Sequence, residues 1–231
     1  MSDFLGNSEE FTMIDSRIRK GTFFASVLLG STVLSGCNSE VSEPATASAQ
    51  EAAAPTGIVR ASFTADGAVE QPTGYREWVY VGTPLTPNAL NGGEAPFPEF
   101  HNVYVEPTAF AAFSETGEWP EGTQIVKELV TVRDNDNAEN GSSAEVSGVG
   151  YFQGEFAGLE LTVKDNDRFG DQPGGWAYFS FGHNAPPYAK TAEAFPTEAC
   201  NACHEQSAET DFVFTQFYPV LRAQQANLAS N

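Results

Sequence analysis

The chain has 231 residues and a formal net charge of −20, with 31 acidic and 11 basic residues. So much negative charge argues against nucleic acid and against an anionic membrane surface as partners, because both would repel the protein. It suits a cationic redox partner or a salty habitat, although an acidic surface that only keeps the protein soluble is the commoner case.

The N-terminal region has the pattern of a bacterial lipoprotein signal. Basic residues at 17–20 precede a short apolar stretch at 22–33, and the stretch ends in Leu-Ser-Gly-Cys37. This order is that of a signal peptide, and its ending resembles a lipobox, whose cysteine becomes lipidated and forms the new N-terminus. The apolar stretch is too short to span a membrane. We therefore expect residues 1–36 to be removed and the lipid on Cys37 to be the only membrane anchor; ordinary cleavage that leaves a free thiol is the alternative.

Asn38 follows the lipobox, which indicates an exported protein on the outer membrane that faces the periplasm. The first twelve residues are acidic, unlike the start of a signal peptide, so Met13 is a candidate start. Residues 37–57 are rich in Ser, Glu, Ala, Thr and Pro and contain no aromatic residue, so they are expected to form a disordered tether. Residues 58–231 then form one domain.

Within this domain, dense aromatic residues and frequent Gly and Pro favour short strands over long helices. Pro107 opens a short helix that ends near Gly117. A run of helical spacing at 212–221 is interrupted by Pro219. We expect loops at 134–143 and 165–175, and strands at 75–82, 101–105, 123–132, 146–163 (one long or two short) and 176–181. The predicted fold is therefore mainly β, of the α+β type: an antiparallel sheet with a few short helices at one end, which carry the site described next.

Residues 200–204 read Cys-Asn-Ala-Cys-His, and C-x-x-C-H is the attachment motif of a c-type haem. Each thiol, of Cys200 and Cys203, bonds to one haem vinyl group, and His204 becomes the proximal iron ligand. The motif fits one helical turn, for which Thr197 is the expected N-cap. We predict one haem c per chain, with its iron as the only metal.

A C-x-x-C pair can also be part of a structural zinc site or a redox-active dithiol. A structural zinc site needs four ligands, and the chain has no second C-x-x-C and no H-x-x-x-H. A redox-active pair belongs in a βαβ pattern, which the sequence does not show. All three cysteines of the chain thus have a covalent role, and no disulfide is expected.

The sixth position on the iron has few candidates. The two methionines, Met1 and Met13, both precede the mature domain, which excludes methionine ligation. The position is therefore filled by His101, by His183 or by another group, or it is empty.

Several segments of the domain have a distinctive sequence. They read Y-R-E-W-V-Y-V-G-T-P-L-T-P-N at 75–88, V-K-E-L-V at 126–130, G-Y-F-Q-G-E-F-A-G-L-E at 150–160, V-K-D-N-D-R-F at 163–169, and, after C-N-A-C-H, F-T-Q-F-Y-P-V-L-R at 214–222. In this order they resemble the cytochrome P-460 family and its relative cytochrome c′-beta, over nearly the whole domain. The resemblance implies a mainly β fold, a homodimer and a five-coordinate haem c.

Members of the cytochrome P-460 family oxidise hydroxylamine with a haem that carries an extra covalent bond from a lysine. That lysine lies in the V-K-E-L-V segment, so the resemblance assigns the bond to Lys127. Cytochrome c′-beta lacks the bond and binds nitric oxide in an apolar distal pocket. The strand pattern itself puts Lys127 on one face with Ile125 and Leu129, and it leaves open whether that face is buried or whether the lysine lies at an exposed edge.

The resemblance also implies the distal side of the haem. Phe97, Phe100 and His101 lie in the segment that supplies distal groups in this family, where a relative has arginine in place of His101. This histidine is a proton acceptor near the substrate, a sixth ligand, or a histidine hydrogen-bonded at the surface. His183 lies in a predicted loop.

Oxidation of hydroxylamine releases protons, which a carboxylate near the iron would accept. Glu193, just before the haem motif, is the first candidate and Glu160 the second, although most carboxylates of such an acidic chain are simply solvated.

Three functions follow. The first is a haem c oxidoreductase that oxidises hydroxylamine, can also handle nitric oxide, and passes electrons to an acceptor cytochrome. The second is a nitric-oxide-binding protein without turnover. The third is an electron carrier with two histidine ligands, which a five-coordinate ferrous spectrum would exclude.

Overall fold

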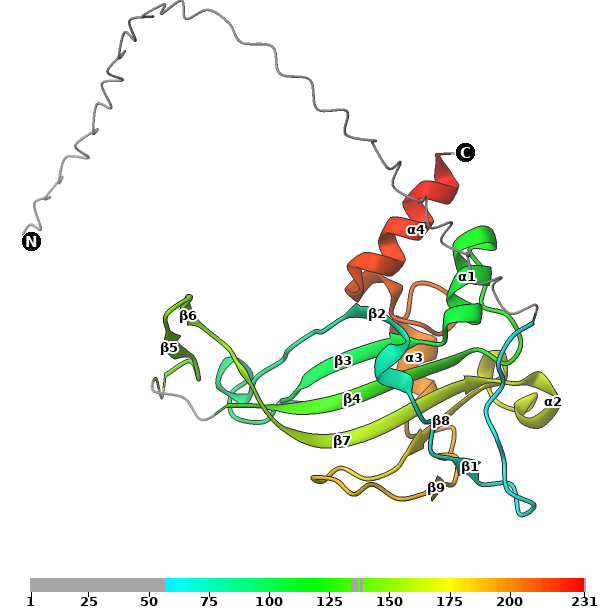
Figure 1. Ribbon diagram of the computed structural model, residues 1–231, viewed down its shortest axis with the longest axis horizontal. Coiled ribbons are helices and arrows are strands. Elements are labelled where there is room, and N and C mark those ends of the chain that lie inside the picture. The colour runs from blue at the N-terminus through cyan, green and yellow to red at the C-terminus, as the bar shows by residue number, and fades with distance from the viewer. Residues whose placement is uncertain (1–56, 134–136, 138, 231) are drawn as a thin grey trace, which may run out of the picture. The chain divides into compact units, whose positions relative to one another are not determined.

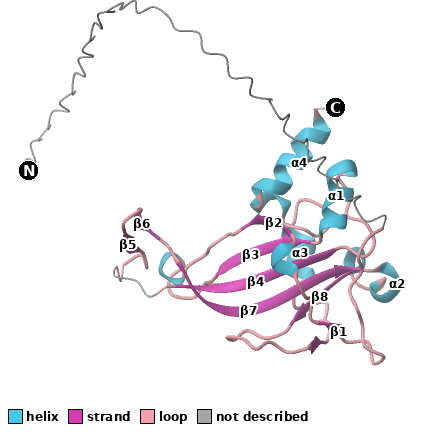
Figure 2. Ribbon diagram, viewed as in Figure 1, coloured by secondary structure: helices cyan, strands magenta, loops and turns pink. Residues whose placement is uncertain are grey.

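The computed structural model describes residues 57–133, 137 and 139–230. Their main feature is a five-stranded antiparallel sheet (Figure 1; Figure 2), which confirms the mainly β prediction. The strands, in their order across the sheet, are β2 (Val79–Gly82), β3 (Phe100–Val105), β4 (Gln124–Val132), β7 (Gln153–Lys164) and β8 (Trp176–Ser180).

Two short strand pairs accompany this sheet. β1 (Val69–Glu70) pairs with β9 (Thr191–Ala192), and β5 (Ser143–Glu145) pairs with β6 (Gly148–Gly150). The segment 146–163, predicted as one long or two short strands, therefore forms two strands, β6 and β7.

Both faces of the main sheet are covered, which explains why the central strands are apolar on both sides. One face packs against α1 and α4, with Val103, Val105 and Trp176 in the shared core. The other face carries a second core that includes Val126, Leu159 and β1. On β4 this alternation puts Lys127 on the face of α1 and α4, the same face as Ile125.

Helix α1 (Pro107–Thr116) forms where the sequence predicts it. Proline occupies its first turn, and the chain leaves the helix at Gly117, whose φ of 77° is left-handed, a conformation that glycine adopts without steric cost. The N-cap is Glu106, which is buried and accepts from the amides of Thr108 and Ala109, both at 3.0 Å. Glutamate is not a preferred N-cap residue, and the sequence analysis did not identify it.

Replacing Glu106 with alanine should therefore lower the free energy of unfolding by about 1–2 kcal/mol, because two amides at the start of α1 lose their acceptor. Denaturant unfolding of the two proteins measures this. Glu115→Ala, an exposed change in the same helix, is the matched control and should change stability by less than about 0.5 kcal/mol. Equal effects of the two substitutions would contradict the capping role.

The structure corrects three predicted elements. The segment 75–82 starts as a 3-10 turn, η1 (Tyr75–Glu77), and only β2 is a strand; the turn brings Tyr75 and Arg76 to the buried Glu128 carboxylate, at 2.6 and 2.5 Å. The predicted loop 165–175 contains α2 (Asn166–Phe169), capped by the side chain of Asp165, and η3 (Pro173–Gly175). These short turns form where side chains bind nearby backbone or buried groups, which hydrophobic periodicity does not report.

The third correction concerns the C-terminus. Pro219 does not interrupt a helix: it opens α4 (Pro219–Ala229), which packs against α1 (Figure 1). Proline is favoured in the first turn, where its missing N–H would have no helical partner. The residues before it form η4 (Thr215–Phe217), and η2 (Asn88–Leu90) is a further short turn.

Other expectations fall on residues outside this description. The signal peptide, Met13, Cys37, Asn38 and the tether up to residue 56 lie there, and so do residues 134–136 and 138 of the predicted loop 134–143. Among the residues that are described, no helix has the length and apolar character that crossing a membrane requires.

Candidate functional site

The C-x-x-C-H motif lies at the start of helix α3 (Asn201–Ser207). Asn201 fixes this helix to the sheet: its side chain is buried and donates to the Trp176 carbonyl oxygen at 2.7 Å. Cys200, rather than Thr197, occupies the N-cap position, so the predicted cap is wrong. The Thr197 hydroxyl instead donates to the side-chain oxygen of Gln172 at 2.5 Å.

All three chemical groups of the motif line one cavity of about 600 Å³. Cys200, Cys203 and His204 line it from the start of α3, and residues of β2, β3, β4, β7 and β8 line it from the sheet. Its walls are mostly apolar, as in small-molecule sites generally, and include Val81, Val103, Val105, Ile125, Phe195, Phe214, Phe217 and Leu221.

His204 is held in one orientation. Its Nδ1 lies 2.7 Å from the carbonyl oxygen of Phe212; this oxygen can only accept, so Nδ1 carries the hydrogen and Nε2 keeps its lone pair. Tyr178 and Phe214 contact the ring, with centroid distances of 4.5 and 4.6 Å. Burial lowers the pKa of His204, so the imidazole is neutral. A neutral imidazole whose second nitrogen is hydrogen-bonded to a carbonyl is the usual arrangement of a metal-ligating histidine.

Lys127 and Glu160 face the same cavity from neighbouring strands. They are directly opposite in the β4–β7 register, and Nζ lies 2.6 Å from Oε2. The lysine Nζ also lies 4.2 Å from the ring centre of Phe97. About a quarter of each of the two charged side chains is exposed. Of the two possibilities that the strand pattern left open for Lys127, a buried face and an exposed edge, the structure shows the buried face, which lines the cavity.

His101 projects into this cavity from β3. Its Nε2 is buried and has no hydrogen-bond partner among the described residues. Burial, and then the positive charge of Lys127, lower the pKa of His101 to about 4, so the ring is neutral near pH 7. The ring of Phe97 lies perpendicular to it at 5.7 Å. An unpartnered buried nitrogen is costly, so this group is suited to binding a ligand in the cavity.

These residues fit a haem: two thiols and an oriented imidazole face an apolar cavity that a few polar groups also line. The family model described as cytochrome P-460 matches residues 72–215, more than half of the chain. The chain belongs to the cytochrome P-460 family. Membership indicates a haem protein. In a direct comparison with curated protein sequences, none matches the chain.

Of the other candidate residues, two lie outside the cavity and two line it. Phe100 does not line the cavity, because it precedes His101 on β3 and adjacent residues of a strand point to opposite faces. Glu193 is exposed and does not line the cavity either, whereas Glu160 does. His183 lines the cavity and bonds through Nε2 to the Glu99 carboxylate at 2.7 Å.

Sequence reasoning missed two groups that contact His204. The ring of Tyr178 comes from a segment recognised only as an aromatic strand. The carbonyl of Phe212 comes from a segment recognised only by its helical spacing. No sequence signal identifies a backbone carbonyl as a partner of a side chain eight residues away, so geometry was needed to find it.

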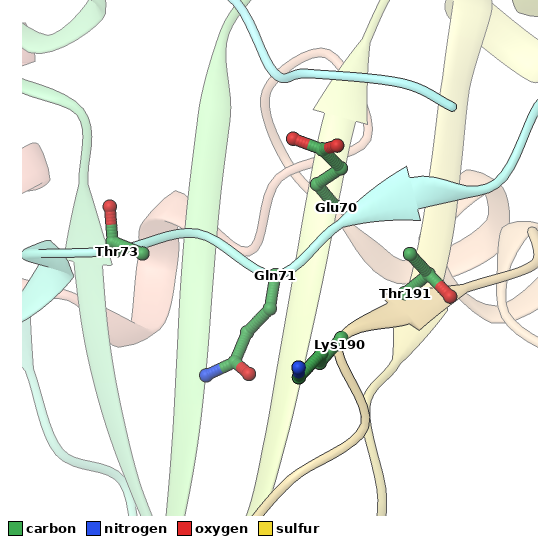
Figure 3. A pocket seen from close by; sticks show the side chains of 5 residues that line it. All are labelled: Glu70, Gln71, Thr73, Lys190 and Thr191. Carbon is green, nitrogen blue, oxygen red and sulfur yellow. The ribbon is translucent and has the colours of Figure 1, made fainter. Parts of the chain in front are cut away.

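A second hollow, of about 450 Å³, lies beside the β1–β9 pair (Figure 3). It is lined by Glu70, Gln71, Thr73, Lys190 and Thr191. None of these lining residues is a histidine or a cysteine, so the C-x-x-C-H motif faces the first cavity and not this one.

Proposed function

We propose that the protein is a haem c oxidoreductase that oxidises hydroxylamine and can also bind nitric oxide. One observation carries the proposal: Lys127 and Glu160 form an ion pair in the cavity that Cys200, Cys203 and His204 line. The family gives a lysine at this place a function, the covalent bond to the haem, and the position of Lys127 beside the attachment motif supports it.

In this proposal, thioether bonds from Cys200 and Cys203 hold the haem, and Nε2 of His204 ligates the iron. The haem supplies the iron that binds hydroxylamine and accepts its electrons. Glu160 would accept protons that the substrate releases, because among the described residues it is the carboxylate that lines this cavity. His101 is neutral and offers Nε2 to the substrate as a hydrogen-bonding partner.

The direct test is to mix the purified, haem-loaded protein with hydroxylamine and an artificial electron acceptor. The expected result is steady reduction of the acceptor, which stops when hydroxylamine is exhausted. Binding of nitric oxide to the ferrous protein without any acceptor reduction would contradict the proposal and favour the gas-binding function. The apolar lining around Phe97 is the observation that supports this second candidate. A six-coordinate ferrous spectrum without substrate would instead favour the electron carrier with His101 as second ligand.

Glu160→Gln should lower kcat for hydroxylamine by about 10²–10⁴-fold, because the cavity loses its proton acceptor. Acceptor-coupled turnover measures the change, and the absorption spectrum of the variant reports whether its haem is altered as well. Glu193→Gln is the matched control, since Glu193 is exposed and outside the cavity. Loss of turnover in Glu193→Gln with full activity in Glu160→Gln would reverse the assignment.

The cellular setting is part of the proposal and rests on the sequence. The lipobox at Cys37 supports an outer-membrane lipoprotein facing the periplasm, where haem c proteins work. The strong negative charge supports a cationic acceptor cytochrome. The family supports a homodimer.

A further inference from the structure

A turn at residues 210–213 carries two adjacent residues in a backbone conformation that L-amino acids rarely adopt. Asp211 has a φ of 45° and Phe212 a φ of 62°, and among the described residues they are the two non-glycine residues with positive φ. The Val213 amide donates to the Thr210 carbonyl oxygen at 2.9 Å, so the pair has the φ signs of the central residues of a type I′ turn. These positions favour Asn and Gly. Such a conformation persists only where the surrounding structure enforces it.

This turn supplies the carbonyl group that orients His204. The Phe212 oxygen accepts the hydrogen of His204 Nδ1 at 2.7 Å, and the Tyr178 hydroxyl approaches the same oxygen at 3.5 Å. Because the φ angles of the turn determine where this oxygen lies, a relaxed turn would lengthen or break its bond to the histidine.

The side chain of Asp211 is fixed to the end of the main sheet. Lys164 Nζ lies 2.6 Å from Oδ2, and Trp176 Nε1 donates to Oδ1 at 3.3 Å. Lys164 and Trp176 are opposite residues of the β7–β8 pair, and Lys164 also donates to the Trp119 carbonyl oxygen at 3.1 Å. Only 14% of the Lys164 side chain is exposed, so this ion pair is less screened by solvent than one at the surface.

Packing holds the second residue of the turn. The ring of Phe212 lies against Gly174. A Cβ atom added to Gly174 would lie only 2.3 Å from that ring. Asp211 is thus held by charge and Phe212 by close contact, which together account for two successive residues with positive φ.

We propose that Asp211 and Lys164 are positioning residues for the proximal ligand. Their ion pair keeps the 210–213 turn in its strained form, so that the Phe212 carbonyl stays bonded to His204. This bond gives the imidazole more negative character, which strengthens its bond to iron and favours the ferric state. The inference rests on the proposed role of His204 as the haem ligand, and it makes a residue pair on the sheet a determinant of the reduction potential.

The test uses the full haem-loaded protein and two substitutions, Lys164→Met and Asp211→Asn. Methionine keeps the aliphatic stem and removes the ammonium group. Asparagine suits the turn and weakens the charge-assisted hydrogen bond. In both variants the iron–histidine stretching band of the ferrous protein should shift to lower frequency and the midpoint potential should rise, with the smaller shift in Asp211→Asn. The double variant should shift no further than Lys164→Met, because both changes act through one pair.

Glu145→Gln is the control. It breaks the exposed ion pair with Arg133, away from the cavity, and should move neither readout. If Lys164→Met and Asp211→Asn keep their haem and only melt at lower temperature, with unchanged band and potential, the pair serves stability alone and the inference is wrong. Neither readout needs hydroxylamine, so the inference and the proposed function can fail separately: shifted values in a protein that does not oxidise hydroxylamine would overturn the function alone.

Discussion

Replacing both Cys200 and Cys203 with alanine, in a chain that also carries Lys127→Arg and so lacks the proposed lysine bond, should abolish covalent haem attachment. Acidified acetone should then extract all haem that the variant still binds, whereas the wild-type protein should keep its haem through denaturation. The reason is chemical: no other side chain in the C-x-x-C-H motif can form a thioether with a vinyl group. The mass of the denatured chain measures the outcome directly, and it requires neither a folded variant nor an active one.

The single variants and one control sharpen this expectation. Cys200→Ala and Cys203→Ala should each leave one bond, and thus a haem that stays with the chain but has one unreacted vinyl group. Cys37→Ala removes the third cysteine of the chain and should leave attachment intact. Haem that stays bound through acetone treatment in the double cysteine variant that also carries Lys127→Arg would refute the proposed attachment, and with it the proposed function.

The fold could be predicted where local chemistry and the tertiary structure agree. Pro107 and Gly117 mark both ends of α1 by backbone preferences that act within one turn. The segment 75–77 could not be predicted, because its turn is stabilised by Glu128, 52 residues away from Arg76. The turn at Asp211 was missed for a similar reason: its anchor is Lys164 on β7.

The residues of the candidate site also fall into two groups: those that local sequence predicts and those whose place depends on the fold. Cys200, Cys203 and His204 are close in sequence, and their spacing alone predicts haem attachment, so this prediction did not need the fold. Glu160 could not be preferred over Glu193, because the choice depends on which residue of β7 lies opposite Lys127. Register is a property of strand pairing, and a slip of one residue would turn the Glu160 side chain to the other face of the sheet.

Replacing Lys127 with alanine should return the spectrum of an ordinary haem c and abolish hydroxylamine oxidation, while the fold survives. A bond from Nζ to the porphyrin would alter the conjugation of the macrocycle, so the Soret band of the reduced wild-type protein should lie far to the red. Lys127 lines the same cavity as Cys200 and Cys203, so its side chain would face a haem that the two cysteines hold. The fold should survive because Lys127 lies at a cavity wall, where its side chain forms an ion pair with Glu160 and lies over the ring of Phe97.

Glu160, the neighbour of Lys127, would supply the proton chemistry that such a bond requires. An amine reacts only after it loses its proton, and Glu160 at 2.6 Å is placed to accept it. Formation of the bond would replace one N–H and one C–H bond by one C–N bond; Glu160 and solvent would take the two protons, and an external two-electron oxidant would take the two electrons. Lys127→Arg is therefore the matched variant: it keeps the charge beside Glu160 but should not form the bond. If the bond matters for activity, arginine should behave like alanine; if only the charge matters, arginine should keep hydroxylamine oxidation.

Peptide mapping decides whether the bond exists. Trypsin does not cleave after a modified lysine, so the cross-linked chain should yield residues 77–133 as one peptide, joined through the haem to residues 191–222. In Lys127→Arg, trypsin should again cleave after residue 127 and release residues 77–127 free of haem. The same free peptide from the wild-type protein, together with an ordinary Soret band and no turnover of hydroxylamine, would rule out the cross-linked enzyme. The cavity would then be that of a nitric-oxide-binding protein, in which the Lys127–Glu160 pair only lines the wall.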